Sequence, residues 1–390
     1  MNRKKYNFCI VTYEAFPNPI TQNLKTFLLE NYRADLLYIF HPMPEVKQGV
    51  LLTSGFNLFR DNQLTKKGTI HQWKVFWLIL YIKDVYYTFF WCLKFKKKFD
   101  VYFAAGNLNP IVGIFLKQIG FVKKIVYISM DYYPTRYKNK FLDWFYFQLD
   151  KFCVRICDET WNVSSMIAKA REKKMGMDRK TYNRQYTVPG GIWFYKTKRL
   201  PFGKVNRKKI VYRGTLLSFM GVDLVIKAMP LILKKIPKLI FEIVGTGEEQ
   251  QNLKNLTIHL KVSKNVIFHG FVEGRKNMEK ILATGAVGMA TFNTDLLDER
   301  VKNSDPGKIK DYMLLGMPVI TTNAFPASKQ IVVNGCGLII PYRVEELAKA
   351  VITLLKNPKL LYEYRKNAIK YIEKFDCNNI LKPNLERVLN

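Results

Sequence analysis

Residues 305–322 have the sequence D-P-G-K-I-K-D-Y-M-L-L-G-M-P-V-I-T-T, which predicts a short helix that leads into a buried strand. A Pro-Gly pair stops the preceding loop, so we expect the helix to begin at about Lys308. Gly316 ends the helix before the apolar strand 319–322. A helix and a buried strand in this order are typical of a parallel sheet covered by helices.

The same helix carries groups that suit a nucleotide. Its first-turn N–H groups lack backbone partners and carry the positive end of the helix dipole, so they favour a bound phosphate. Lys308 adds a full positive charge next to the Gly307 amide, and Asp311 can accept hydrogen bonds from two vicinal hydroxyls. The alternative is an ordinary helix between a polar loop and a buried strand. These residues alone do not distinguish a nucleotide-binding helix from such a structural helix.

Apolar runs rich in β-branched residues alternate with helical stretches along the whole chain. This alternation predicts parallel sheets covered by helices, in two doubly wound α/β units. The predicted strands of the first half are 8–13, 35–40, 101–105, 125–130, 159–163 and 185–188, and those of the second half are 209–213, 239–244, 266–268, 286–290, 319–322 and 337–340.

The length of 390 residues suits two domains of ordinary size. The charged segment 196–209 has a Pro and a Gly and little apolar periodicity, so it is the best candidate for a linker. We therefore predict a first domain at 1–200, a second at 207–357, and C-terminal helices at 358–390 that pack back on the first domain.

The composition limits the partners and the compartment. A formal net charge of +32 attracts nucleic acid, anionic lipid or phosphorylated substrates. No DNA- or RNA-binding motif is present, so nucleic acid is not an expected partner. The six cysteines lie mostly in apolar runs and are expected to be reduced core thiols. The N-terminus lacks the pattern of a secretory signal, which favours a cytoplasmic protein.

Residues 73–95, W-K-V-F-W-L-I-L-Y-I-K-D-V-Y-Y-T-F-F-W-C-L-K-F, are apolar almost all round. Lys83 and Asp84 interrupt the run near its middle and argue against a membrane span. Two alternatives remain open, a helix buried against the first sheet and a helix that lies in a membrane interface, where aromatic and basic residues are favoured. Lys94 and Lys96–Lys98 at the end of the run suit the second alternative.

Loops at the carboxyl ends of successive parallel strands should meet at one edge of the second sheet, where such sheets bind ligands. A glycine in such a loop lets the backbone approach a phosphate, and an arginine can form a bidentate pair with it. The candidate donor-binding residues in these loops are Arg213, Gly214 and Thr215 after the first strand, Gly245 and Gly247 after the second, and Gly270, Phe271 and Val272 after the third. The G-T-G-E segment 245–248 lacks the third glycine of the dinucleotide fingerprint, so we do not expect a nicotinamide site.

Four segments in this half, in order, make the chain similar to a known family. They are Y-R-G-T-L-L-S-F-M-G-V-D-L-V-I-K-A, F-E-I-V-G-T-G-E, V-I-F-H-G-F-V and S-D-P-G-K-I-K-D-Y-M-L-L-G-M-P-V-I-T-T. Residues 208–357 resemble the donor half of the family-4 (group 1) glycosyltransferases, which take a sugar from a nucleotide diphosphate. The resemblance implies the GT-B fold, in which two doubly wound Rossmann-like parallel-sheet domains face each other across a cleft and C-terminal helices follow.

The resemblance also implies roles for individual residues. Asp311 takes the place of the family's ribose-binding glutamate, and Lys308 with the Gly307 amide faces the diphosphate and assists its departure. The family often has a glutamate that touches the sugar eight residues before this carboxylate, where the present chain has Asn303. Asn303 or Asp305 is the expected substitute.

Two departures concern the phosphates. The family usually has G-R-L and a following K-G, which place an arginine and a lysine on the diphosphate. This chain has G-T-L at Gly214 and Met220-Gly221 at the second position. Lys308 is therefore expected to carry more of the phosphate charge, and Arg213 is a candidate to assist it.

Asp131 is the candidate catalytic residue of the first half. The segment D-Y-Y-P begins there, after the strand 125–130, and Met130 takes the place where the family often has a histidine near the reacting carbon. A carboxylate at this position can stabilise developing positive charge or accept the acceptor's proton. The alternative is that Asp131 only fixes the loop 131–136 through backbone hydrogen bonds.

The leading hypothesis is a glycosyltransferase that moves a sugar from a nucleotide-sugar donor to a glycan or lipid-linked acceptor, with retention of configuration, in cell-surface polysaccharide or glycolipid synthesis. Neither a metal nor another cofactor is expected. The basic first half suits an anionic membrane surface, which favours a peripheral position on the inner face of the plasma membrane. The alternatives are a non-catalytic GT-B-like module that binds a glycan, a lipid or a protein, and a nucleotide-sugar epimerase.

Overall fold

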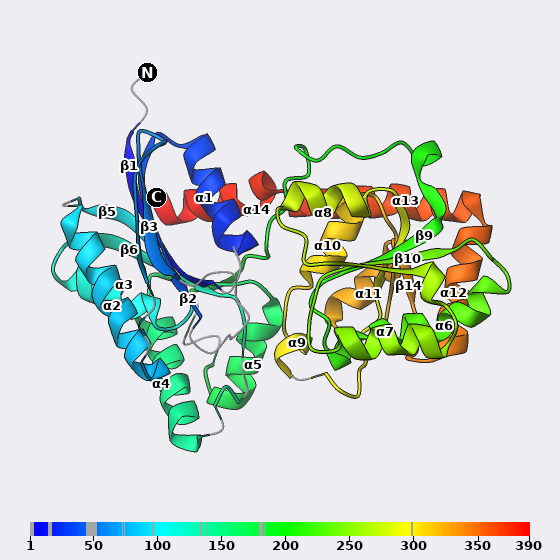
Figure 1. Cartoon of the computed structure of the whole chain (residues 1–390). Coiled ribbons are helices and arrows are strands. Elements are labelled where there is room, and N and C mark those ends of the chain that lie inside the picture. Colours follow the sequence, from blue (N-terminus) through cyan, green and yellow to red (C-terminus); the bar gives the residue numbers. More distant parts are fainter. Residues whose placement is uncertain are drawn as a thin grey trace. The chain divides into compact units, whose positions relative to one another are not determined.

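Two β-sheets, each covered by helices, form two units in this computed structural model (Figure 1). The structure describes residues 4–14, 18–43, 53–71, 73, 75–95, 97–132, 135–137, 139–178, 182, 184–297 and 299–390. The first unit comprises residues 1–191, 303–305 and 377–390, and the second comprises 192–302 and 306–376. Each unit is a Rossmann-like α/β domain, as the sequence predicts.

The first sheet has the strand order β4-β3-β2-β1-β5-β6-β7-β8. The pairs from β2 to β8 are parallel, whereas β3 pairs antiparallel with both β2 and β4. The strands are β1 (Tyr6–Glu14), β2 (Ala34–Pro42), β3 (Thr53–Arg60), β4 (Gln63–His71), β5 (Phe99–Ala105), β6 (Val122–Ser129), β7 (Glu159–Asn162) and β8 (Gln185–Thr187).

The antiparallel hairpin β3–β4 was not predicted from the sequence. The predicted strands include none between residues 40 and 101, and the structure corrects this. The edge strand β4 is polar and almost wholly exposed, so it lacks the apolar run that marks the other strands. The turn that joins the two strands has positive φ angles at Asp61 (44°) and Asn62 (69°) and contains no glycine. Neither the strand nor its turn therefore carries the usual sequence signal.

Helices cover both faces of this sheet. Figure 1 shows α2 and α3 on one side of the strands and α1 and α14 on the other. The helices of the unit are α1 (Pro19–Asn31), α2 (Trp77–Lys94), α3 (Asn109–Gln118), α4 (Lys140–Ile156), α5 (Ser165–Met175) and α14 (Cys377–Leu389). The core between sheet and helices includes Cys9, Val11, Leu37, Trp91 and Tyr102.

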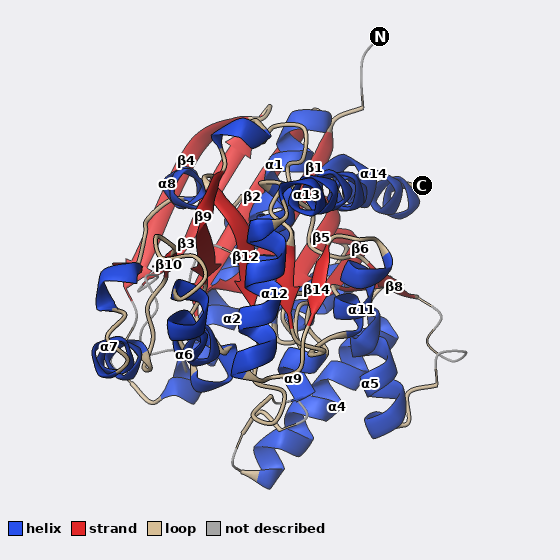
Figure 2. Cartoon of the chain, turned by 90° about the vertical axis from the view of Figure 1, so that its right-hand side faces the viewer, coloured by secondary structure: helices blue, strands red, loops and turns tan. Residues whose placement is uncertain are grey.

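The second sheet is entirely parallel, with the order β11-β10-β9-β12-β13-β14. Its strands are β9 (Asn206–Arg213), β10 (Ile240–Val244), β11 (Val266–Gly270), β12 (Gly285–Ala290), β13 (Val319–Thr321) and β14 (Gly337–Ile339). All six predicted strands of this half are confirmed. In Figure 2 these strands, in red, are accompanied by helices in blue.

The helices of the second unit contribute side chains to two apolar clusters. One cluster contains residues of α6 and α12, and the other contains residues of α10. They are α6 (Val222–Leu233), α7 (Gln250–His259), α8 (Arg275–Leu282), α9 (Glu299–Lys302), α10 (Gly307–Leu314), α11 (Pro326–Val333), α12 (Val344–Lys356) and α13 (Pro358–Ile372). The boundary between the two units lies near Gly191, so the segment 196–209 belongs to the second unit. The two C-terminal helices are divided between the units, with α13 in the second and α14 in the first.

Helix α2 buries the two charges that interrupt its apolar sequence. Lys83 and Asp84 are 2% and 1% exposed, and their side chains form an ion pair of 2.9 Å. His41 Nδ1 lies 3.1 Å from the same carboxylate, and Ser54 donates to it. Among the described residues, no helix is long and apolar enough to span a membrane.

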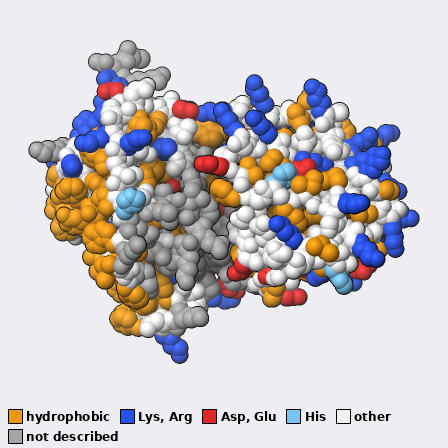
Figure 3. All heavy atoms as spheres, viewed as in Figure 1, with side chains coloured by type: hydrophobic (Ala, Val, Ile, Leu, Met, Phe, Trp, Pro, Cys, Tyr) orange, Lys and Arg blue, Asp and Glu red, His pale blue; other side chains and the backbone are white. Residues whose placement is uncertain are grey.

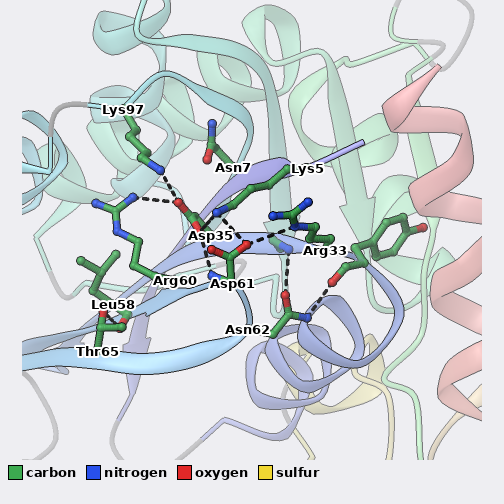
Figure 4. A network of polar contacts seen from close by, with 12 residues as sticks. Lys5, Asn7, Arg33, Asp35, Leu58, Arg60, Asp61, Asn62, Thr65 and Lys97 are labelled. Carbon is green, nitrogen blue, oxygen red and sulfur yellow. Dashed lines mark hydrogen bonds and ion pairs between the residues drawn. The ribbon is translucent and has the colours of Figure 1, made fainter. Parts of the chain in front are cut away.

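Asp35, at the start of β2, joins four segments of the first unit by charge. Figure 4 shows the side chains of Lys5, Arg60 and Lys97 pointing toward its carboxylate. The backbone N–H of Asp61 donates to it as well, at 2.9 Å, which fixes the hairpin turn. Although burial disfavours the charged carboxylate, these hydrogen bonds hold the pKa of Asp35 well below its usual range.

We predict that Asp35→Asn lowers the free energy of unfolding of the first unit by about 1.5–3 kcal/mol at neutral pH, the range for hydrogen bonds to a charged group. Because the pKa is lowered by folding, the difference from wild type is present above about pH 4 and disappears as the pH falls through the lowered pKa. Urea unfolding followed by tryptophan fluorescence measures it. Asp61→Asn, at a more exposed carboxylate of the same network, is the control and should change stability less.

Candidate functional site

The second sheet reverses its strand order between β9 and β12, which is where parallel sheets bind ligands. The side chain of Tyr312, on α10, connects the two central strands at this point. Its hydroxyl accepts a hydrogen bond from Arg213 N (2.8 Å) and donates to Met289 O (3.1 Å). The ring packs on Gly288, where a methyl group would lie 2.3 Å from it. Helix α10 is therefore fixed across the carboxyl ends of both central strands.

Glycines allow the neighbouring loops to pack backbone against backbone. Gly245 N donates to Gly270 O (2.8 Å), so the loops after β10 and β11 are joined. A methyl group at Gly245 would lie 1.9 Å from Gly214 O, and one at Gly247 would lie 2.2 Å from Leu216 O. The structure thus brings the predicted glycines after three successive strands to one edge of the sheet.

Lys308, in the first turn of α10, points at the loop after β9. Its Nζ lies 3.1 Å from Tyr212 Oη and 3.2 Å from Met220 Sδ. A methyl group at Gly214 would be 3.3 Å from the same Nζ. Burial of the ammonium and the nearby Arg213 guanidinium hold the pKa of Lys308 well below its usual range. An anion at this position would relieve both effects.

Asp311 lies between two arginines. Its carboxylate forms an ion pair with Arg213, and its Oδ1 lies 3.0 Å from a guanidinium nitrogen of Arg275. Arg275 also pairs with Glu279 at 2.7 Å. The carboxylate of Asp311 is only 7% exposed, so these guanidinium groups supply the compensation that a buried charge requires.

The guanidinium of Arg213 includes a buried donor that no described residue uses. Its Nε is buried and has no hydrogen-bond partner among the described residues. A methyl group at Gly307 would lie 3.9 Å from the guanidinium of Arg213. Arg213, Gly214, Gly307 and Lys308 therefore converge, with Asp311 one turn further along the helix. This arrangement has the donors and charges that a diphosphate requires.

The remaining candidate residues of the second unit, Thr215, Phe271 and Val272, lie in the loops after β9 and β11. Thr215 is exposed, and its carbonyl accepts a hydrogen bond of 2.8 Å from Tyr212 Oη. Phe271 is exposed after Gly270, whereas Val272 is partly buried against the apolar cluster around α10.

Three predicted residues belong to the first unit. Asp131 is exposed and follows β6. Asp305 accepts a hydrogen bond from Gly190 N at 2.9 Å. Asn303 is buried, and its Nδ2 has no hydrogen-bond partner in the described part of the chain, so it has donors for a ligand. Tyr133 and Pro134 of the D-Y-Y-P segment, like Lys96, lie outside the described residues.

Three residues that shape the site could not be recognised from the sequence. They are Tyr212, Arg275 and Tyr312. Tyr212 and Tyr312 lie within the quoted segments, but an aromatic residue in an apolar pattern indicates only a core position. Arg275 lies in a polar stretch with other charges, and no spacing in the sequence links it to Asp311. In the described residues, no group of three or more His, Cys, Asp or Glu side chains is placed to hold a metal ion.

Comparison of the sequence with known proteins points to one class. Residues 196–375 match the family model "Glycosyl transferases group 1". The chain is 27% identical over 182 residues to an uncharacterized glycosyltransferase of Haemophilus influenzae, a match that covers 46% of this chain and 48% of the relative. It is 24% identical over 184 residues to the poly(glycerol-phosphate) alpha-glucosyltransferase of Bacillus subtilis, covering 45% of this chain and 25% of that protein. The matches thus span about half of the first relative and a quarter of the second.

The fold is similar over nearly the full chain to that of HepE from Anabaena. The structure of HepE with UDP has a TM-score of 0.68 and 15% identity, and the similarity covers 98% of this chain and 99% of HepE. HepE has also been crystallised with UDP-glucose. The chain therefore has the GT-B fold, and the match to the family model lies within its second unit.

We predict that Gly245→Ala disrupts the site by steric overlap. The added methyl group would meet the Gly214 carbonyl, which is backbone and cannot rotate away, so we expect a loss of about 3 kcal/mol or more in unfolding free energy. Gly270→Ala is the matched control. It adds a methyl group with nothing within 4 Å, so only its positive φ costs energy, about 1–2 kcal/mol. Equal losses in urea unfolding would contradict the close approach of the two loops.

Proposed function

We propose that the protein is a glycosyltransferase of the family-4 type that transfers a sugar from a UDP-sugar. The observation that carries the proposal is the convergence of Lys308, the Gly307 amide and the Gly214 loop at the start of α10, with Asp311 one turn away. The family match of residues 196–375 and the UDP complexes of HepE support it. The nucleotide-binding groups lie in the second unit.

Each group has a role in binding the donor. The diphosphate accepts hydrogen bonds from the Gly307 N–H and from Lys308, and the free Nε–H of Arg213 adds a further donor. Asp311 accepts hydrogen bonds from the ribose hydroxyls. Each carboxylate oxygen has two lone pairs, so it can bind a hydroxyl and keep its guanidinium partner.

In the reaction, the bond between the anomeric carbon and the diphosphate oxygen breaks, and the acceptor oxygen forms a bond with that carbon. Negative charge develops on the departing diphosphate, where the helix N-terminus and Lys308 stabilise it. The acceptor hydroxyl gives its proton to an oxygen of the departing diphosphate as the new bond forms. Asp131 of the first unit is the candidate carboxylate to stabilise the positive charge on the sugar, and Asn303 and Asp305 are candidates to hold the sugar hydroxyls.

The transfer is proposed to retain the anomeric configuration and to use a hexosyl donor without a metal or another cofactor. A glycan or lipid-linked acceptor suits a chain with a net charge of +32, because such acceptors are often phosphorylated or embedded in anionic membranes. The proposed setting is cell-surface polysaccharide or glycolipid synthesis by a cytoplasmic protein on the inner face of the plasma membrane.

Calorimetric titration with UDP and with GDP, at moderate salt, tests the proposal. Saturable binding of UDP and slow release of sugar from a UDP-sugar would support a transferase. If the folded protein bound neither nucleotide, a non-catalytic binding module would be the better description.

We predict that Lys308→Ala weakens UDP binding by about 1.5–3 kcal/mol, the range for a hydrogen bond to a charged group. Because the pKa of Lys308 is lowered, wild-type affinity for UDP should fall as the pH rises through that pKa, while the pH still lies below 10.5. Lys308→Ala should lack this step. An unchanged affinity in the folded variant would remove Lys308 from the site.

We predict that Asp311→Ala weakens the binding of uridine and of UDP by similar factors, because both contain the ribose. Lys308→Ala is the comparison, since it should weaken only UDP. Circular dichroism and thermal unfolding must show that the variant is folded, because Arg213 and Arg275 lose their partner. A loss confined to UDP would contradict the assignment of Asp311 to the ribose.

A further inference from the structure

Helices α2, α3 and α4 of the first unit expose large apolar side chains to an unusual extent. The exposed residues are Leu78, Ile79, Ile82, Tyr86 and Phe90 on α2, Phe115 and Ile119 on α3, and Phe141, Trp144, Phe145, Phe152 and Ile156 on α4. Several lie four positions apart, at 78, 82, 86 and 90 and again at 141 and 145, so each set lies along one side of its helix. We call these twelve residues the aromatic face.

The three helices are neighbours, so the aromatic face is one surface. Helix α3 packs against both α2 and α4. The rings of Phe89 on α2 and Phe115 on α3 lie 5.4 Å apart. Figure 3 shows hydrophobic side chains gathered over these helices. Contiguous apolar surface of this kind marks an interaction site.

The charges around the aromatic face are positive. Lys94, Lys140 and Arg155 are exposed on the same helices, and Lys94 Nζ lies 5.3 Å from the ring centre of Phe90. Among the described acidic side chains of these helices, Asp84 and Asp150 are buried, and Asp143 is partly buried and accepts hydrogen bonds from the backbone N–H groups of Arg136 and Tyr137. The surface thus combines apolar and cationic groups.

A pocket of about 490 Å³ opens at one end of this face. Trp144 and Phe147 of α4 supply apolar walls, and Lys151 of α4 and Lys174 of α5 supply positive charge. Trp144 belongs both to the pocket and to the aromatic face. The pocket therefore has cationic groups beside an apolar surface. This combination suits an anionic phosphate headgroup whose acyl chains lie in a bilayer next to it.

We propose that the aromatic face docks on the surface of an anionic phospholipid bilayer. Aromatic rings are favoured at the boundary between headgroups and acyl chains, and each nearby Lys or Arg adds about 1 kcal/mol on anionic lipid. A second copy of the chain would bring the same positive charges to the contact, so charge favours lipid over self-association. The inference rests on the membrane setting of the proposed function and deepens it, because it names the surface of the first unit that contacts the bilayer.

Co-sedimentation of the full chain with vesicles tests the inference. One set of vesicles is phosphatidylcholine alone and the other contains phosphatidylserine as well. We expect binding to the second set, and we expect Ile82→Asp to weaken it about tenfold or more, because a large apolar side chain leaves the bilayer and a negative charge replaces it. The matched control is Ile258→Asp on α7 of the second unit, since Ile82 and Ile258 are 70% and 67% exposed.

A second readout reports the contact itself. Trp144 fluorescence should be quenched by brominated phospholipid in the anionic vesicles, and Trp144→Phe should remove that part of the quenching. Equal losses for Ile82→Asp and Ile258→Asp would overturn the assignment of the face, and equal binding to both vesicle sets would overturn the role of charge. Self-association that Ile82→Asp abolishes, without vesicle binding, would show a second copy as the occupant.

The proposed function and the membrane inference fail separately in these experiments. Ile82 lies outside the nucleotide site, so Ile82→Asp should bind UDP with wild-type affinity. Wild-type protein that binds vesicles and not UDP would overturn only the proposed function. Protein that binds UDP and no vesicles would overturn only the docking of the aromatic face.

Discussion

The proposed nucleotide site depends on the hydroxyl of Tyr312, which connects α10 to the ends of β9 and β12. Because this ring is fully buried and packs against Gly288, the helix can approach the sheet closely enough for its first turn to meet the loop at Gly214. The position of Lys308 and that of Asp311 follow from this single attachment. A helix held one residue out of register would turn these two side chains away from the loop.

The sequence predicted the elements of the site better than their contacts. The Pro-Gly pair before Lys308 and the glycines after each strand carry a backbone signal, because only glycine tolerates the approach seen at Gly245. No such signal accompanies Arg275, which meets Asp311 only through the packing of α8 beside α10. Contacts between residues far apart in the sequence depend on packing, and a single sequence contains no pattern that records them.

The same contrast between local sequence signals and long-range contacts applies to the fold. The twelve predicted strands are all present because buried parallel strands are apolar runs, which local composition reveals. The hairpin β3–β4 was missed because its outer strand is mostly polar and exposed, and because Arg60 and the turn residue Asp61 are held by contacts with Asp35 that the sequence does not reveal. Lys83 and Asp84 seemed to interrupt the apolar run of α2, yet both point inward, so the exposed side of that helix is uninterrupted.

The two proposals use the basic composition of the chain in physically different ways. At the proposed nucleotide site, the buried Asp311 pairs with two arginines, whereas Lys308 contacts a phenol and a thioether and has no carboxylate partner among the described residues. Burial and the nearby Arg213 disfavour its charge, so a bound anion would stabilise the protonated ammonium. On the aromatic face the lysines are exposed and weakly held, so their attraction to an anionic surface is screened by salt. A buried and an exposed set of cations should thus respond differently to ionic strength, with nucleotide binding the less sensitive of the two.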